Sequence, residues 1–169
     1  MNKHNLLRAA LTEAIPDYAK NPDDLRMWVE QGGIVARQNL GNSNRAFEWR
    51  YTLNVDVINF TLHPNLVVLA INEWLAVNQP DLLTPSHTPS YTFEVDVIDA
   101  KTVDLAFKLE LSEAVQVVKR PDGGFNMTTF TEPDPLMADL AALSPLPLSE
   151  VWFGGERLLP GPPLPEPAP

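Results

Sequence analysis

The sequence FEWRYTLNVDV, residues 47–57, alternates apolar and polar side chains without a break. That period of two predicts a long strand with one buried face and one solvated face. Residues 34–40 carry a shorter strand pattern, and the stretch Gly41-Asn42-Ser43-Asn44 between the two segments is typical of a turn. Together the two segments predict an antiparallel hairpin.

Residues 93–97 and 103–111 alternate in the same way on either side of a short loop. In the register that pairs Val97 with Val103, every apolar residue of both strands falls on one face, which favours that register. A Pro-Asp-Gly-Gly turn indicates one more hairpin. This last predicted hairpin joins residues 115–118 to residues 125–130.

Helices are predicted in three places. Residues 3–18 carry an apolar stripe, in which Pro16 predicts an early end or a kink. Asn21-Pro22-Asp23-Asp24 is typical of a helix start and Gly32-Gly33 of a helix end, so a second helix is expected between them, with Leu25, Trp28 and Val29 on its apolar side. Residues 66–77 are apolar nearly all round, which predicts a helix that is buried or covered by a neighbouring subunit. The fold class is therefore expected to be α+β, with about three helices packed on one face of a mainly antiparallel sheet.

Composition and charge exclude several classes of function. Of the 169 residues, 44% are hydrophobic, and 12 basic side chains stand against 22 acidic ones. Because phosphate binding needs clustered Lys and Arg, no specific nucleic-acid site is expected. The absence of cysteine excludes disulfides, thiolate metal sites and cysteine nucleophiles. No apolar run approaches the roughly 20 residues of a membrane span, so we expect a soluble protein without a membrane partner.

Proline divides the chain, because ten of the seventeen prolines follow residue 132. We expect an α+β body over residues 1–132, a proline-rich arm over 133–159 and a disordered tail over 160–169. Inside the arm, Val151, Trp152 and Phe153 precede Gly154-Gly155, a pattern that predicts a short docking strand and turn.

No catalytic, cofactor or metal site is predicted. The three histidines stand apart, and His63 beside Pro64 is more typical of a loop or helix cap. No nucleophile elbow or phosphate-binding glycine loop is present.

A set of four carboxylates is the strongest candidate for chemistry: Glu94, Asp96, Asp104 and Glu110. Paired carboxylates can hydrolyse a glycoside or bind Mg²⁺ or Ca²⁺. The predicted register puts the set on the polar face of a hairpin, with Asp96 opposite Asp104. A solvated acidic face is the favoured interpretation, although directly opposed like charges also suit a cation site or a surface that faces an anionic polymer.

The four tryptophans divide into core and interface candidates. Trp49 and Trp74 are expected in the core, since large apolar residues usually lie inside. Trp28 is an open interface candidate. Trp152, flanked by Val151 and Phe153 in an otherwise extended arm, is the best anchor for a partner, because tryptophan is enriched at interfaces.

Two longer stretches resemble a known family. RYTLNV at residues 50–55 and WLAVNQPD at residues 74–81 are similar to segments of the tail completion protein R family of contractile-tailed temperate phages. LRAALT at residues 7–12, and Glu150-Val151-Trp152 after the proline-rich stretch, agree with the same family. The similarity covers nearly the whole chain.

The resemblance implies a structural protein of the virion tail, assembled in the host cytoplasm, with no catalytic residues. Proteins of this role commonly form a ring, often hexameric, that stops tube or sheath growth at the head-proximal end and offers a docking surface to the head. The implied partners are further copies of the chain, the tail tube or sheath protein, and head–tail connector proteins. Headless tail-like bacteriocins use the same parts.

Two functions of other classes remain open from the residues alone. One is a small hydrolase that uses Glu94, Asp96 and Asp104. The other is a monomeric binding module whose arm serves as a peptide ligand for a partner. Light scattering separates a ring from a monomer, and an ion-dependent activity would favour the hydrolase.

Overall fold

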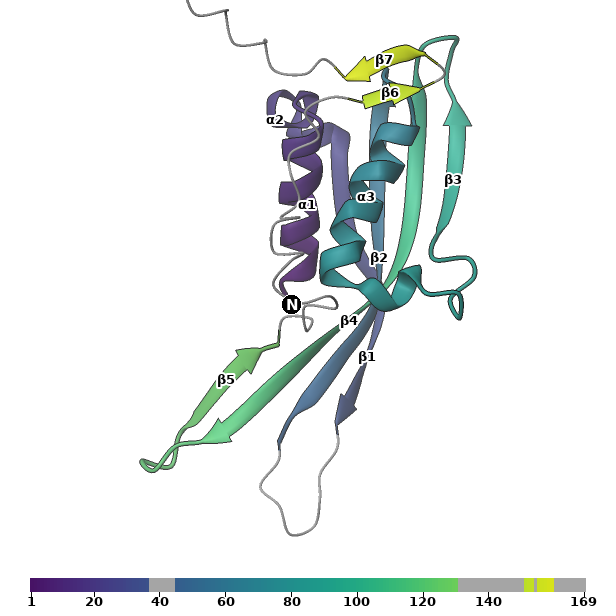
Figure 1. Ribbon diagram of the computed structural model, residues 1–169. Coiled ribbons are helices and arrows are strands. Elements are labelled where there is room, and N and C mark those ends of the chain that lie inside the picture. Colours follow the sequence, from purple (N-terminus) through teal and green to yellow (C-terminus); the bar gives the residue numbers. More distant parts are fainter. Residues whose placement is uncertain (37–44, 131–150, 154, 160–169) are drawn as a thin grey trace, which may run out of the picture.

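A computed structural model describes residues 1–36, 45–130, 151–153 and 155–159 of the chain. Two helices, α1 and α3, lie side by side on one face of a twisted antiparallel sheet (Figure 1). This arrangement confirms the predicted α+β class. The helices are α1 (Lys3–Ala14), α2 (Asp17–Lys20) and α3 (Asn65–Asn78), with single 3₁₀ turns at Pro22–Asp24 and Pro80–Leu83. The strands are β1 (Leu25–Ala36), β2 (Phe47–Phe60), β3 (Thr92–Val97), β4 (Val103–Lys119), β5 (Phe125–Thr129), β6 (Val151–Phe153) and β7 (Glu156–Leu159).

The large sheet has the order β1-β2-β4-β3, and β5 pairs with the second half of β4. The predicted register of the β3–β4 hairpin is confirmed, since Val97 lies opposite Val103 and Phe93 opposite Phe107. The hairpin of β1 with β2 is confirmed as well, while its predicted turn at residues 41–44 lies outside the described residues. The β4–β5 hairpin also forms as predicted.

The core lies between the two long helices and the sheet. Leu7 and Leu11 of α1, Ile71 and Leu75 of α3 and Val55 of β2 are fully buried there. On the sheet, the buried residues are the alternate positions of β2 and β4. As predicted, α1 ends early: Pro16 follows its last turn and begins the short α2.

The predicted helix over residues 22–33 is wrong. After one 3₁₀ turn at Pro22–Asp24 the chain enters the twelve-residue strand β1, of which all residues but Glu30, at a register shift, pair with β2. The local capping pattern does start a helical turn, but the turn is only three residues long. The burial of Leu25 and the pairing with β2 then favour a strand. Gly32 lies inside this strand, where an added Cβ would stand 3.2 Å from the Arg50 carbonyl oxygen and from the Tyr51 Cβ. It therefore permits close strand approach and does not end a helix.

The two strands predicted at 103–111 and 115–118 are one strand, β4. An acidic residue at an inward position, Glu113, interrupts the apolar alternation and conceals this continuity. The side chain of Glu113 is nonetheless buried, with 2% of its surface exposed.

A separate two-stranded hairpin of β6 and β7 forms at the predicted place, with Phe153 opposite Glu156. It lies near the end of the sheet that carries α2 and the β3–β4 turn (Figure 1). The rest of the predicted arm and the predicted tail, residues 133–150 and 160–169, lie outside the described residues.

Candidate interaction surfaces

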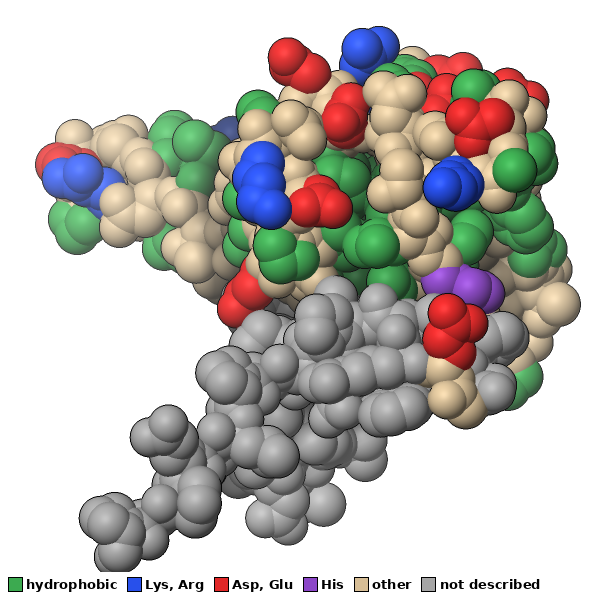
Figure 2. Space-filling model, turned by 90° about the horizontal axis from the view of Figure 1, so that it is seen from above, with side chains coloured by type: hydrophobic (Ala, Val, Ile, Leu, Met, Phe, Trp, Pro, Cys, Tyr) green, Lys and Arg blue, Asp and Glu red, His purple; other side chains and the backbone are tan. Residues whose placement is uncertain are grey.

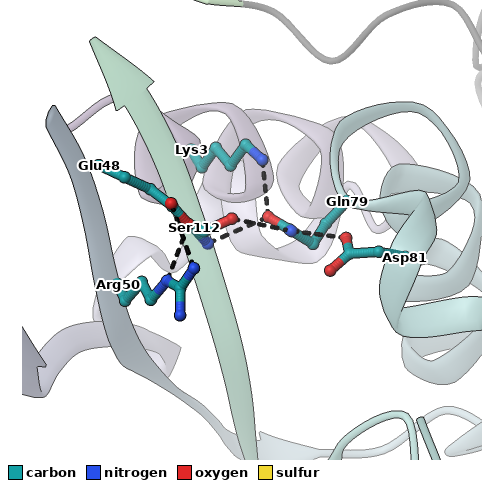
Figure 3. A network of polar contacts seen from close by, with 6 residues as sticks. All are labelled: Lys3, Glu48, Arg50, Gln79, Asp81 and Ser112. Carbon is teal, nitrogen blue, oxygen red and sulfur yellow. Dashed lines mark hydrogen bonds and ion pairs between the residues drawn. The ribbon is translucent and has the colours of Figure 1, made fainter. Parts of the chain in front are cut away.

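A buried polar network joins the start of α1 to the end of α3 and to β4 (Figure 3). The ammonium of Lys3 donates to Gln79 Oε1 over 2.6 Å, and the backbone N–H of Ser112 donates to the same oxygen over 3.1 Å. Gln79 Nε2 donates in turn to Asp81 Oδ1 over 2.6 Å. Lys3 and Gln79 are 6% and 2% exposed, so each has its hydrogen bonds inside the protein.

A second buried group, Glu113, binds the first turn of α1. Its carboxylate accepts the backbone N–H of Asn2 over 2.6 Å, that of Lys3 over 3.3 Å, and the hydroxyl of Tyr51. Backbone N–H groups at a helix start lack partners within the helix, and the helix dipole there favours a negative charge. Burial, followed by the hydrogen bond to Glu113, raises the pKa of the Tyr51 hydroxyl above its ordinary value.

The predicted acidic face exists on the side of the sheet opposite the helices. Asp96 lies directly opposite Asp104, and with Glu94 and Asp56 these side chains surround a shallow hollow of about 230 Å³. Asp104 Oδ1 accepts the backbone N–H of Asn59 over 2.8 Å. The pKa of Asp56 is raised by burial, with a further increase from Asp104 that the nearby Arg26 opposes.

Glu110 does not join this hollow. It lies further along β4, where its carboxylate accepts the hydroxyl of Thr52 over 2.8 Å. Within the described residues, no three His, Cys, Asp or Glu side chains stand close enough to hold a metal ion. His63 Nδ1 accepts the backbone N–H of Asn65 over 3.2 Å at the start of α3, the capping role expected for it.

The tryptophans follow the prediction only in part. Trp74 is buried with 3% exposed, as predicted. The prediction of Trp49 as a core residue is wrong, since 36% of it is exposed. Trp28, the open interface candidate, is 46% exposed on the helix-free face, opposite Asn54. Trp152 lies in β6 with Val151 and Phe153, and the backbone of that strand pairs with β7.

Trp49 is exposed because the sheet is much longer than the helices that cover it. α1 has 12 residues and α3 has 14, so each is only about 20 Å long, whereas the 17 residues of β4 extend roughly 55 Å. Figure 1 shows the ends of β1, β2, β4 and β5 running on past the helices. We call this part the distal ribbon (residues 32–36, 47–50, 114–119 and 125–129).

The helix-side face of the distal ribbon remains apolar, although none of the residues that the structure describes covers it. Ile34 lies opposite Trp49, and Met127 lies opposite Val117. Phe47 contacts Trp49 edge to face, with ring centroids 6.1 Å apart. Ile34 and Met127 are 52% and 69% exposed. The alternation of apolar and polar residues, which normally indicates a buried face, thus continues along the strands into a region where that face is exposed.

A second uncovered apolar surface lies on β3. Phe93, Val95 and Val97 share the helix-side face with the buried side of β4 but are 65%, 43% and 74% exposed. We call these three residues the β3 patch. The exposure of these residues does not follow from the sequence, because alternation shows which side chains share a face and not how far the covering helices reach.

Comparisons with known proteins identify the family. Residues 1–135 match the model of the family described as P2 phage tail completion protein R (GpR). The chain belongs to this family. The tail completion protein R of Escherichia phage P2 is 35% identical over 137 residues, which cover 80% of this chain and 86% of that protein. No solved structure matches the chain.

Membership in the tail completion protein R family confirms the resemblance seen in the sequence. It gives the chain a structural role in completing a phage tail, as a tail component assembled in the host cell and not as an enzyme. The hydrolase alternative is thereby set aside. In the part of the chain that the structure describes, no helix has both the length and the apolar character needed to cross a bilayer.

The two stretches that carry the resemblance hold the fold together. In RYTLNV, Tyr51 binds Glu113 and Leu53 is 1% exposed in the core. In WLAVNQPD, Trp74 is buried and Gln79 joins the network of Lys3, Ser112 and Asp81. Most residues of these two stretches are therefore structural.

Proposed function

We propose that the chain assembles with itself into a closed ring at the head-proximal end of a contractile tail, hexameric as the sequence resemblance implies. There the ring ends the growth of the tube or sheath and offers a docking surface to head–tail connector proteins. Family membership supports a role in tail completion. The observation that carries the self-assembly is the pair of uncovered apolar surfaces, the distal ribbon and the β3 patch.

Uncovered apolar surfaces of this kind favour a partner. Large apolar side chains scattered singly are ordinary, but contiguous ones on a folded protein mark interaction sites. The distal ribbon and the β3 patch are each contiguous through strand pairing. A protein that completes a multisubunit tail meets such partners during assembly, when both surfaces become buried.

We propose further that the acidic face around Asp96 and Asp104 lines the passage for DNA in the ring. Glu94 and Asp56 add to the same charge, and Glu110 extends it along β4. A wall of like charge repels the duplex and prevents it from adhering while it moves. The opposite face of the same strands carries the apolar surfaces, so one sheet serves both purposes.

The arm, residues 133–159, is proposed to act between subunits, outside a body that ends at residue 132. Glu156 in its hairpin borders a cleft of about 1090 Å³ formed with Phe60–Pro64, the β3–β4 turn and Val97, so the cleft adjoins one end of the β3 patch. Eighteen residues, 133–150, connect the body to β6 and can extend up to roughly 60 Å. That length lets Val151, Trp152 and Phe153 reach the same cleft on a neighbouring copy, an exchange typical of domain-swapped oligomers.

Light scattering of the purified full chain tests the ring. A single species of three or more chains, at about six times the 18.8 kDa chain mass for a hexamer, supports it. A protein that remains monomeric at every concentration contradicts it and favours a single-chain binding module. An electron-microscopy map of the isolated tail end then shows whether the ring contacts the tube, the sheath or both.

A further inference from the structure

The distal ribbon and the β3 patch differ in charge as well as in position. Residues 45–50 and 114–125 contain four basic side chains, Arg45, Arg50, Lys119 and Arg120, and two acidic ones, Glu48 and Asp122. Residues 92–104, which include β3 and its turn, contain four acidic side chains, Glu94, Asp96, Asp99 and Asp104, and one basic side chain, Lys101. The two apolar surfaces therefore lie in fields of opposite sign.

The surfaces are also complementary in form. The distal ribbon projects away from the helices, whereas the β3 patch lies beside them at the edge of the sheet (Figure 1). Seen from above, hydrophobic side chains follow the edge that carries β3, and basic side chains stand near the tip of the lobe that projects on the opposite side (Figure 2). In the part of the chain that the structure describes, no strand pairs with the outer edge of β3.

We propose that the helix-side face of the distal ribbon packs on the β3 patch of a second copy of the chain. Because one copy uses its ribbon and the next uses its patch, the contact is heterologous, and its repetition generates a ring when the rotation closes. Met127, Phe125 and Trp49 then lie against Phe93, Val95 and Val97, and the two sheets pack face to face. This contact rests on the proposed ring and specifies the surfaces that build it.

Electrostatics sets the direction of the contact. The acidic residues of β3 lie on the face of the strand opposite the β3 patch and in the β3–β4 turn. Their electrostatic field still reaches the patch through the thickness of one strand, because the screening length at physiological salt is about 8 Å. Arg45, whose guanidinium lies 5.2 Å from the centroid of the Phe125 ring, brings a cation to the apolar face of the ribbon itself. A ribbon therefore meets a patch more favourably than it meets another ribbon, which disfavours a symmetric ribbon-to-ribbon pair.

Two single variants test the contact by blocking its two sides separately. Met127→Glu brings a negative charge to the acidic patch, and Val97→Lys brings a positive charge to the basic ribbon. Both side chains are more than two thirds exposed, at 69% and 74%, so the fold is expected to be retained. Each variant alone should elute as a monomer of 18.8 kDa. The matched controls, Asn126→Glu on β5 and Thr92→Lys on β3, place the same charges on the opposite face and should keep the wild-type mass.

Mixing the two variants gives the decisive measurement. The Val97→Lys copy retains its ribbon and the Met127→Glu copy retains its patch, so one of the two alternating contacts is unaltered. At the other contact the introduced carboxylate meets the introduced ammonium, and their opposite charges attract. Light scattering of the mixture should therefore show an oligomer of alternating copies, at twice the chain mass or more, and circular dichroism should show wild-type melting for every variant.

The outcomes separate this contact from the ring itself. Variants that still form the wild-type ring, or folded monomeric variants whose mixture stays monomeric, overturn the contact and leave the ring standing. A wild-type chain that is monomeric at every concentration overturns the ring and the contact together.

Discussion

At the scale of single residues, Glu113 connects the N-terminal helix to the sheet. It accepts hydrogen bonds from two backbone N–H groups and from Tyr51, and nearly all of its surface is buried. A buried carboxylate is stable only while such donors surround it. Sequence analysis had no signal for this role, because its donors are 62 to 111 positions away along the chain.

We expect Glu113→Ala to lower the free energy of unfolding by about 2–3 kcal/mol, because it leaves buried donors without an acceptor. Urea denaturation followed by circular dichroism measures the change. The control is Glu110→Ala, which removes a carboxylate from an exposed position three residues earlier in β4 and should cost less than about 1 kcal/mol. Equal losses in the two variants would contradict the anchoring role of Glu113.

Alkaline pH should destabilise the protein through Tyr51. Its pKa is raised in the folded state, so the unfolded chain loses this proton first as the pH rises above about 10. From there upward the folded state binds more protons than the unfolded state, and the free energy of unfolding falls with pH. Denaturation midpoints between pH 8 and pH 11 should drop less steeply in Tyr51→Phe than in the wild type. Tyr18 and Tyr91, whose pKa burial also raises, contribute to the slope that remains.

Leu53→Asp should unfold the body. Leu53 lies at the centre of β2, 1% exposed, between Val29 of β1 and Leu109 of β4. An unpaired buried charge there costs several kcal/mol, comparable to the whole stability of a small domain. Gln116→Asp at an exposed position of β4 serves as the control. Unchanged melting of Leu53→Asp would show that the faces of β2 are inverted.

At the scale of elements, the sequence predicts the helices and strands whose spacing of apolar residues is not contradicted by another local pattern. β2 and the β3–β4 register follow from alternation alone, and α3 follows from its apolar run. β1 was not predicted because the capping signal at Asn21-Pro22 can be seen in the local sequence. The pairing of β1 with β2 depends on residues far away along the chain. The length of β4 was missed because Glu113 is polar at an inward position. How far the helices reach along the sheet depends on packing in three dimensions, which periodicity does not record.

The position of Gly32 inside β1 gives a test of that strand. Gly32→Ala should lower the free energy of unfolding by about 1 kcal/mol, because the added Cβ meets the backbone of β2 at 3.2 Å. Gly33→Ala is the matched control, since no heavy atom lies within 4 Å of its added Cβ. We expect the control to be neutral or slightly stabilising. Equal effects of the two substitutions would contradict the close approach of β1 to β2 at Gly32.

The hairpin of β6 and β7 belongs to the same scale. Truncation after Glu132, or Trp152→Ala, should leave a folded body and a weaker ring, because the proposed anchor on the neighbouring copy is lost. Gel filtration at decreasing concentration measures the weakening. A truncated protein that dissociates at the same concentration as the full chain would remove the arm from assembly.

At the scale of the whole molecule, one sheet presents opposite chemistry on its two faces. Replacing Glu94, Asp96 and Asp104 together with Gln or Asn should leave folding and tail assembly intact, since all three lie outside the core. Relief of the repulsion between Asp96 and Asp104 should keep the melting temperature at or above that of the wild type. DNA ejection from phage that carry the triple variant should be slower, because the proposed passage repels the duplex less. Loss of assembly would instead indicate that this face is buried against a partner.

The projection of the distal ribbon has a genetic consequence. Its exposed side chains contribute little to the core, so a copy with a damaged ribbon still folds and still offers its β3 patch. In the proposed ring, such a copy would still bind a neighbour through its β3 patch, but it would offer no functional ribbon to the next copy. Ribbon mutations should therefore be dominant: plasmid-borne Met127→Glu, expressed during infection by wild-type phage, would reduce the burst size far more than its share of the protein pool. Co-expressed Asn126→Glu would leave the burst size unchanged. A cell that already expresses the Met127→Glu variant before infection would resist the phage.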